Sequence, residues 1–139
     1  MSRVSAALRR RVRLRARNLC EYCRSNADYT GHDFTIDHIT PAAAAGTSDF
    51  DNLCLCCFWC NNFKQARTEQ QDPRTGHRVR LFNPRLDIWQ EHFRWSLTMT
   101  RILGRTAIGR ATVRALRLNR PTLIRARRIW ARHGLHPPR

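Results

Sequence analysis

Two pairs of cysteines carry the clearest chemical signal in the 139-residue sequence. Cys20 and Cys23 form one C-x2-C pair, and Cys57 and Cys60 form a second pair after 33 intervening residues. Each such turn can direct two thiolates at one tetrahedral zinc ion, so two turns supply all four ligands. Because the gap is longer than in an ordinary zinc ribbon, the sequence predicts a structural zinc that clasps an inserted unit.

The two remaining cysteines, Cys54 and Cys56, have no partner at ligand spacing, and we expect both to be buried as small apolar side chains. The N-terminal segment lacks the apolar stretch of a secretory signal, which favours reduced thiols over disulfides. Its arginine-rich, acid-free character also suits an organellar transit peptide, and that alternative stays open. We expect a cytoplasmic protein.

Asp37 and His38, between the cysteine pairs, place a hard oxygen ligand next to a base. Hydrolysis of a phosphodiester by water requires a base that removes a proton and a cation that neutralises the developing charge. His38 suits the first role because imidazole is largely neutral near pH 7, and Asp37 suits a divalent cation. Strict alternation along a strand places the two side chains on opposite faces, so their local geometry stays open.

The surrounding pattern predicts the elements that position these groups. In the first half we expect a basic amphipathic helix over 4–19 with Ser2 or Ser5 as its N-cap, a strand within 32–40, a strand over 52–56 and a helix over 58–71. In the second half we expect an extended segment over 74–84, a helix over 87–95, a strand over 97–103, helices over 106–119 and 121–133, and a loose tail. These elements predict one α+β domain over 1–139, consisting of a basic helix (1–19), a zinc-clasped core (20–71) and a basic extension (72–139).

Charge is distributed unevenly along this chain, whose net charge is +16. Residues 1–19 contain seven arginines and no acid, residues 71–139 contain sixteen arginines and three acids, and the segment between them is net negative. Basic flanks suit a polyanion, and an acidic centre suits a divalent cation. The candidate phosphate contacts are Arg110, Arg114, Arg117, Arg125 and Arg128, although for any one of them a solvated charged surface is the better explanation.

Four aromatic residues of the C-terminal half, Trp89, Phe93, Trp95 and Trp130, could stack on bases, but their helical spacing favours core packing. His32 could contact a substrate, although an ordinary loop histidine is the simpler interpretation. The other histidines, which have no ligand spacing, are expected to be structural or exposed: His77, His92, His133 and His136. No apolar run is long enough to span a membrane, so a membrane partner is not expected.

The segments TIDHITP and DNLCLCCFWCNNFK, together with the cysteine pairs around them, resemble the HNH endonuclease family, which has a ββα-metal fold. The C-terminal half, with WQEHFRW, an arginine-rich stretch and a closing HPP, resembles small bacterial HNH proteins, which extends the resemblance over nearly the whole chain. The third motif position is Asn61 instead of histidine, a variation that the family accommodates. The resemblance also singles out Cys57 over Cys54 and Cys56 as a zinc ligand, because Asn52 precedes it by five residues.

The resemblance implies a role for each matching residue. His38 would be the general base, while Asp37 and the amide oxygen of Asn61 would hold one Mg²⁺ or Mn²⁺ ion. Asn52 would brace the loop and orient the histidine. Lys64, three residues after Asn61 on the predicted helix, could reach a phosphate next to the metal. The expected substrate is nucleic acid, in particular DNA.

Each of these polar residues also has an ordinary interpretation when it is taken alone. His38 could be a partly buried histidine, Asn52 a turn residue and Lys64 a solvated surface charge; in order and framed by the cysteine pairs, they favour a nuclease site. Two alternatives remain open. One is a zinc-stabilised nucleic-acid-binding module without catalysis, and the other is a toxin or defence nuclease controlled by a partner.

Overall fold

The computed structural model describes residues 4–139 and mixes helices with strands, as predicted. The chain folds as two compact units. The first runs to Thr68 and includes the later segment Asn83–Leu86, and the second consists of Glu69–Phe82 and Asp87–Arg139. The expectation of a single domain over 1–139 stays a prediction. No helix within the described residues is long and apolar enough to cross a membrane.

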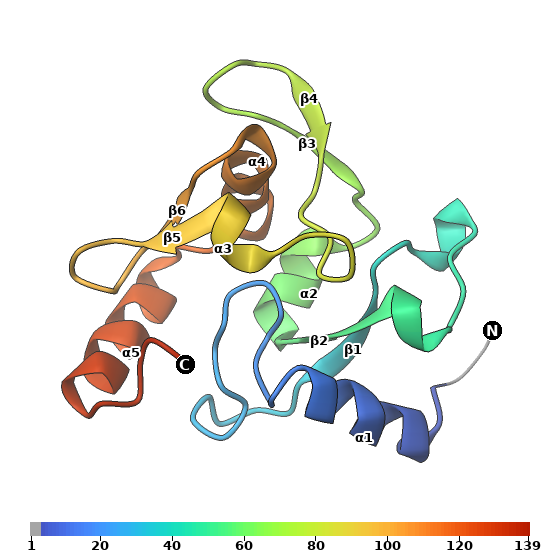
Figure 1. Cartoon of the computed structure of the whole chain (residues 1–139), viewed down its shortest axis with the longest axis horizontal. Helices are drawn as coiled ribbons and strands as arrows, with labels where there is room; N and C mark the ends of the chain where they lie inside the picture. Colours follow the sequence, from blue (N-terminus) through green and yellow to red (C-terminus); the bar gives the residue numbers. More distant parts are fainter. Residues whose placement is uncertain (1–3) are drawn as a thin grey trace. The chain divides into compact units, whose positions relative to one another are not determined.

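The first unit is built around one antiparallel pair of strands (Figure 1). Its elements are α1 (Ala6–Arg15), β1 (Thr35–His38), two short 3-10 helices (Ala42–Ala44 and Phe50–Asn52), β2 (Leu53–Cys56) and α2 (Phe58–Lys64). The register places Asp37 opposite Cys54 and His38 opposite Leu53. Every residue of β2 is buried, so this strand forms the centre of the unit.

Helix α1 begins where the sequence predicts and ends earlier. Ser5 is its N-cap, and the Ser5 hydroxyl accepts a hydrogen bond from the Leu8 amide at 3.1 Å, while the alternative cap Ser2 lies outside the described residues. The helix ends at Arg15 and not at residue 19, because Arg17 and Asn18 both take positive φ angles that turn the chain toward the first cysteine pair. Val12 is its buried contact with the core.

Helix α2 is half as long as the predicted helix over 58–71, and this expectation was wrong. It ends at Lys64 because Gln65 takes a φ of 50°, which breaks the helical backbone without a glycine or proline. The chain then extends into β3 (Glu69–Gln71), which pairs antiparallel with β4 (Arg78–Arg80) in the second unit.

The second unit packs helices against two short hairpins. Besides β3 and β4 it contains α3 (Trp89–His92), β5 (Phe93–Trp95), β6 (Ile102–Gly104), α4 (Ala107–Leu116) and α5 (Pro121–Arg132). The predicted helix over 87–95 is a single helical turn followed by strand β5. Of the predicted strand over 97–103, only the last two residues belong to β6. Helices α4 and α5 agree with prediction: Thr106 caps the first, and Pro121 begins the second.

Aromatic and aliphatic side chains form the core of this unit. Trp89 and Phe93 are buried with ring centroids 5.1 Å apart, which confirms core packing for this pair. Helix α4 passes so close to α3 that a Cβ atom on Gly109 would lie 2.0 Å from the carbonyl oxygen of His92. The expectation of a loose C-terminal tail was wrong, because His136 is buried and bonds the Met99 carbonyl at 2.8 Å.

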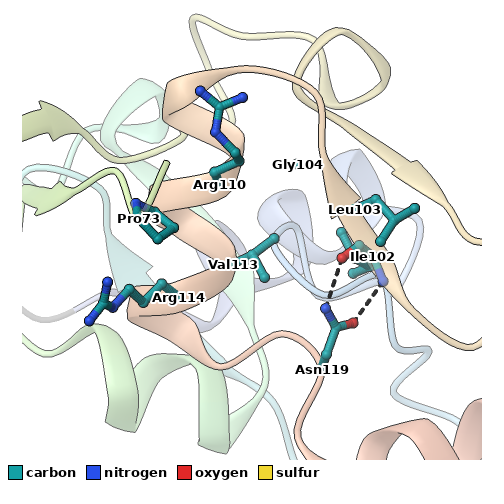
Figure 2. A pocket seen from close by; sticks show the side chains of 8 residues that line it. All are labelled: Pro73, Ile102, Leu103, Gly104, Arg110, Val113, Arg114 and Asn119. Carbon is teal, nitrogen blue, oxygen red and sulfur yellow. Dashed lines mark hydrogen bonds between the residues drawn. The ribbon is translucent and has the colours of Figure 1, made fainter. Parts of the chain in front are cut away.

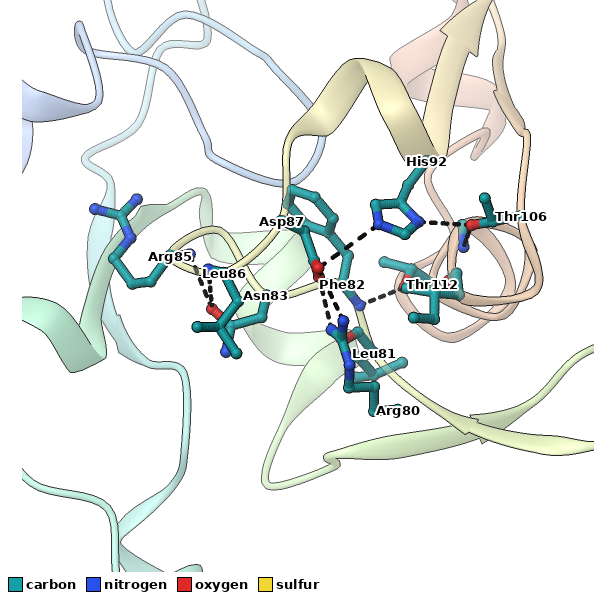
Figure 3. Close-up of polar contacts among 12 residues, drawn as sticks. Arg80, Leu81, Phe82, Asn83, Arg85, Leu86, Asp87, His92, Thr106 and Thr112 are labelled. Carbon is teal, nitrogen blue, oxygen red and sulfur yellow. Dashed lines mark hydrogen bonds and ion pairs between the residues drawn. The ribbon is translucent and has the colours of Figure 1, made fainter.

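A chain of polar contacts links the β3–β4 hairpin to α3 and α4 (Figure 3). The carboxylate of Asp87 accepts hydrogen bonds from Arg80 at 2.6 and 2.8 Å and lies 3.6 Å from Nε2 of His92. Nδ1 of the same histidine lies 2.6 Å from the hydroxyl of Thr106, the N-cap of α4. Both ring nitrogens of His92 therefore have partners within the second unit.

Candidate functional site

The four predicted zinc cysteines come together in the first unit. The sulfur atoms of Cys20, Cys23, Cys57 and Cys60 all lie within 4.8 Å of one another, and all four residues are buried. The first pair lies in a turn closed by hydrogen bonds between Cys20 and residues 24 and 25, and the second pair begins helix α2. Two separate segments therefore converge on one point.

The geometry of this cluster suits a tetrahedral zinc ion. Sulfur atoms bound to zinc at about 2.3 Å lie about 3.8 Å apart, and the Cys23 and Cys57 sulfurs are 3.8 Å apart. The buried cluster of four cysteines could hold a structural zinc. Cys54 and Cys56 lie outside the cluster and are fully buried, as expected, and burial raises the pKa of both thiols well above its usual value.

Asp37 is a buried residue of strand β1, with 6% of its surface exposed. Its Oδ2 atom accepts a hydrogen bond from the Tyr22 hydroxyl at 3.0 Å and lies 3.7 Å from the sulfur of Cys54. Desolvation by burial raises the pKa of the Asp37 carboxyl, although the neighbouring Lys64 opposes the shift. The neighbouring apolar residue Ile36 is only half-buried, so on this strand the carboxylate is the more buried group.

Lys64 is the cation that compensates this carboxylate. Its ammonium lies 3.1 Å from Oδ2 of Asp37 and also donates to the carbonyls of His38 and Ile39 at 3.3 and 3.4 Å. Only 2% of the residue is exposed, so the surface-charge interpretation is wrong. An ammonium has three donors, and these three partners account for them. Contact between Lys64 and a phosphate stays a prediction.

His38 lies next to Asp37 in sequence but has separate contacts. Its Nε2 atom is 2.9 Å from the hydroxyl of Ser48, and the side chain is half-buried. The contact with Ser48 holds Nε2 in place, and among the described residues no hydrogen bond to Nδ1 is found. Nothing in the spacing of the sequence distinguishes Ser48 from other small polar residues of its loop.

Asn52 closes the loop that carries Ser48. Its amide oxygen accepts from the Thr40 backbone at 2.8 Å, and its amide nitrogen donates to the carbonyls of Thr40 and Thr47 at 3.0 and 2.6 Å. Gly46 makes this closure sterically feasible, because a Cβ atom there would lie 1.7 Å from the Thr40 carbonyl oxygen. The asparagine thus holds both ends of the loop next to His38.

Asn61 follows Cys60 directly on helix α2 and is half-buried. One turn of helix separates it from Lys64, whose side chain contacts Asp37. This arrangement brings the helix that carries Asn61 to the strand that carries Asp37 and His38. The cysteine cluster anchors the start of the same helix, so the cysteines and the polar residues are positioned by one helix.

Two further residues, which sequence reasoning did not single out, complete the surroundings of the cysteine turn. Tyr22 is fully buried and links the turn to Asp37, and Glu21 is buried between the Leu55 amide, at 2.8 Å, and the guanidinium of Arg85. Burial raises the pKa of the Glu21 carboxyl, against the opposing effect of Arg85. Both residues lie between Cys20 and Cys23, where the C-x2-C pattern leaves residue type unspecified.

The predicted phosphate contacts of the second unit differ among themselves. Arg114, Arg117, Arg125 and Arg128 are exposed, as a phosphate contact requires. The guanidinium of Arg110 instead forms two 2.9 Å hydrogen bonds with buried Asp72, which gives this residue a structural partner.

A hollow of about 380 Å³ lies beside the helix that carries Arg110 and Arg114 (Figure 2). Its remaining lining residues are Pro73, Ile102, Leu103, Gly104, Val113 and Asn119. The Asn119 side chain bonds both backbone groups of Ile102, at 2.7 and 2.8 Å, at the beginning of strand β6. The hollow is mostly apolar, and its polar groups are largely engaged within the fold.

Comparison with known proteins identifies one part of the chain. Residues 20–67 match the family model described as HNH endonuclease. The matched segment contains both cysteine pairs and the residues from Asp37 to Lys64, and it supports nuclease activity in general. It does not extend to the C-terminal half, so the resemblance expected over nearly the whole chain is limited to this domain. No curated protein and no solved structure matches the chain.

Proposed function

We propose that the protein is a metal-dependent HNH endonuclease that hydrolyses DNA phosphodiester bonds. The observation that carries the proposal is the family match over residues 20–67, within which Asp37, His38, Asn52 and Asn61 occur in motif order. The order β1, β2, α2 supports a ββα-metal core for this segment.

The proposed structural zinc bound by the four cysteines would serve folding. The cluster joins the turn at Cys20 to the start of α2, and a short domain gains stability when metal binding is coupled to folding. Through Tyr22 the same turn contacts Asp37, so loss of the zinc would also loosen the proposed catalytic carboxylate.

His38 is the proposed general base. Ser48 holds Nε2, and Asn52 holds the loop that presents Ser48, so the imidazole is restrained in two steps. Nδ1 then accepts the proton of the attacking water. Restraint of the ring matters because a general base must lie within hydrogen-bond reach of the proton that it removes.

Asp37 and Asn61 would hold the catalytic Mg²⁺ or Mn²⁺ ion. Carboxylate and amide oxygens are the hard donors that these cations prefer. Within the described residues, Oδ1 of Asp37 has one contact, with Lys64 at 3.4 Å, so a lone pair remains for a metal. A divalent ion held there by Asp37 and Asn61 would supply positive charge to polarise the phosphoryl oxygen and to stabilise the charge that develops in hydrolysis.

The basic second unit is the proposed nucleic-acid-binding part of the chain. Arg114, Arg117, Arg125 and Arg128 are exposed, and arginine pairs well with phosphate. Contacts of this kind position a nucleic acid without reading its sequence. Binding without catalysis, the alternative function, requires these arginines but not the His38 site.

The test is plasmid cleavage by the zinc-loaded protein in Mg²⁺, in Mn²⁺ and without a divalent cation. We expect nicking that requires the divalent ion and that disappears in His38→Ala. The matched control is His77→Ala, an exposed histidine of the β3–β4 hairpin, which should cleave like wild type. A wild-type protein that binds the plasmid and leaves it intact in both metals would favour the binding module instead.

A further inference from the structure

Helix α2 presents a group of aromatic side chains to solvent. Phe58 and Trp59 are 53% and 48% exposed, and the half-buried Phe63 follows one turn later. The ring of Trp59 lies nearly parallel to that of Phe63, with centroids 6.0 Å apart and an interplanar angle of 29°. Phe58 meets Trp59 edge to face at 5.1 Å. We call these three side chains the aromatic surface.

The buried side chains of helix α2 are not its aromatic ones. Cys60 and Lys64 point into the core from the same helix, and Trp59 and Phe63, four residues apart, lie on an outer face. Outer positions of a short surface helix are ordinarily polar. Exposed aromatic side chains that gather on one face are typical of a binding surface.

We propose that the aromatic surface stacks on unpaired bases of the nucleic acid that the first unit cleaves. This inference rests on the proposed function and adds a preference for substrates with unpaired bases near the cleaved bond. Aromatic rings are the groups on which unstacked bases bind, and such stacking tolerates any sequence because every base has a flat face.

The charge of the chain favours a nucleic acid over an apolar protein partner. Arg67 is exposed just beyond the end of the helix, Asn62 is an exposed polar residue of the same helix, and the arginine-rich flanks of the chain carry its net charge of +16. Each large apolar side chain of this surface is a ring, and rings are the groups on which bases stack. A basic chain with exposed rings is the combination found in surfaces that bind single strands.

The position of the surface also connects it with the proposed catalytic residues. Asn61 lies two residues from both Trp59 and Phe63 and therefore points to a different side of the helix from the rings. Because an α-helix with its side chains is about 10–12 Å across, a base stacked on Trp59 would belong to a nucleotide a few positions from the bond held by Asn61 and Asp37. In a regular duplex the bases are stacked on each other, so a single strand, a loop or a frayed end fits this surface better.

The test compares Trp59→Leu, which removes the ring and keeps apolar bulk, with Trp59→Phe, which keeps a ring. Affinities of the full-length, zinc-loaded chain are measured by fluorescence anisotropy for a labelled single-stranded oligonucleotide and for its duplex, without added divalent cations. We expect Trp59→Leu to lose about tenfold in single-strand affinity, Trp59→Phe to retain most of it, and duplex affinity to change less than about twofold. Equal single-strand affinity in Trp59→Leu and wild type would overturn the proposal.

A second measurement uses the wild-type chain and does not depend on the folding of a variant. Ultraviolet crosslinking to an oligonucleotide that contains 5-iodouridine should label residues 58–63, as mapped by mass spectrometry. Crosslinks found only elsewhere would contradict the proposal, and so would self-association that requires Trp59 in the absence of nucleic acid. Both measurements record binding, so a chain that stacks bases but never cleaves would refute the nuclease proposal separately.

Discussion

Two buried carboxylates, one in each unit, show how differently this chain uses the same chemical group. Asp72 in the second unit accepts four hydrogen bonds of 2.8–3.1 Å, two from Arg110 and one each from the Arg74 amide and the Thr75 hydroxyl. Asp37 in the first unit has its closer contacts on Oδ2 and only a 3.4 Å contact on Oδ1. A carboxylate with every lone pair engaged serves the fold, whereas one with spare capacity can bind a ligand.

The pKa values of the two carboxyl groups are shifted in opposite directions. Hydrogen bonds from Arg110 hold the pKa of the Asp72 carboxyl far below its usual range. Burial raises the pKa of the Asp37 carboxyl, because the single cation Lys64 offsets only part of the desolvation. The comparison indicates that Asp72 forms a closed polar pair within the second unit, while Asp37 in the first unit keeps hydrogen-bonding capacity on Oδ1.

The largest expected effect is the loss of the structural zinc, which should unfold the first unit and leave the second unit folded. Cys60→Ser should abolish stoichiometric zinc binding and unfold the first unit, because three protein ligands no longer close the structural site. Helices α4 and α5 of the second unit should stay protected. Zinc content by mass spectrometry and hydrogen exchange mapped along the chain would measure both effects. Equal loss of protection in both units would break the comparison.

The next prediction compares the same substitution, aspartate to asparagine, at the two buried carboxylates. Asp37→Asn should lower the rate of metal-dependent cleavage by about 100-fold or more, because it removes the charged ligand of the proposed divalent ion. Asp72→Asn should leave the rate per folded molecule within about threefold of wild type. Cleavage rates at saturating Mg²⁺, corrected for the folded fraction, provide the measurement. A larger loss in Asp72→Asn would reverse the assignment of roles.

Acid should weaken the second unit through Asp72. Since the pKa of this group is lower in the folded than in the unfolded chain, its stabilisation is complete above about pH 5 and declines as pH falls through about 4 and below. The melting temperature of Asp72→Asn should therefore lie below that of wild type by roughly 5 °C at pH 7, with the gap narrowing toward pH 3. Calorimetry across this range would measure the gap, and Glu91→Gln, at an exposed acid of α3, is the control. A gap that widens in acid would contradict the prediction.

The smallest expected effect concerns the positioning of His38. Ser48→Ala removes the hydroxyl 2.9 Å from Nε2 and should lower the cleavage rate by about tenfold or less, with little change in substrate affinity. Ser96→Ala, in the second unit, is the matched control. An unchanged rate would remove Ser48 from the account.

The sequence predicted the parts of this arrangement that depend on local spacing. The cysteine cluster, both strands of the first unit and the N-cap Ser5 follow from residue types a few positions apart. The end of α2 could not be predicted, because Gln65 breaks the helix without a glycine or proline.

Partners distant in sequence were also beyond prediction. Lys64 finds Asp37 across 27 residues and Arg110 finds Asp72 across 38, so burial of either cation depends on tertiary packing. Tyr22 and Ser48 carry no spacing signal at all. Local patterns therefore identified the candidate residues, while the side chains that hold them required the structure.

The most direct test of the account measures binding and cleavage of one labelled DNA in parallel, under single-turnover conditions, for two variants. His38→Ala should bind with wild-type affinity and fail to cleave in Mg²⁺. The variant with Arg114, Arg117, Arg125 and Arg128 all replaced by Gln should bind weakly and with a shallower salt dependence, yet cleave at the wild-type rate once saturated. Cleavage by His38→Ala at the wild-type rate would contradict the account.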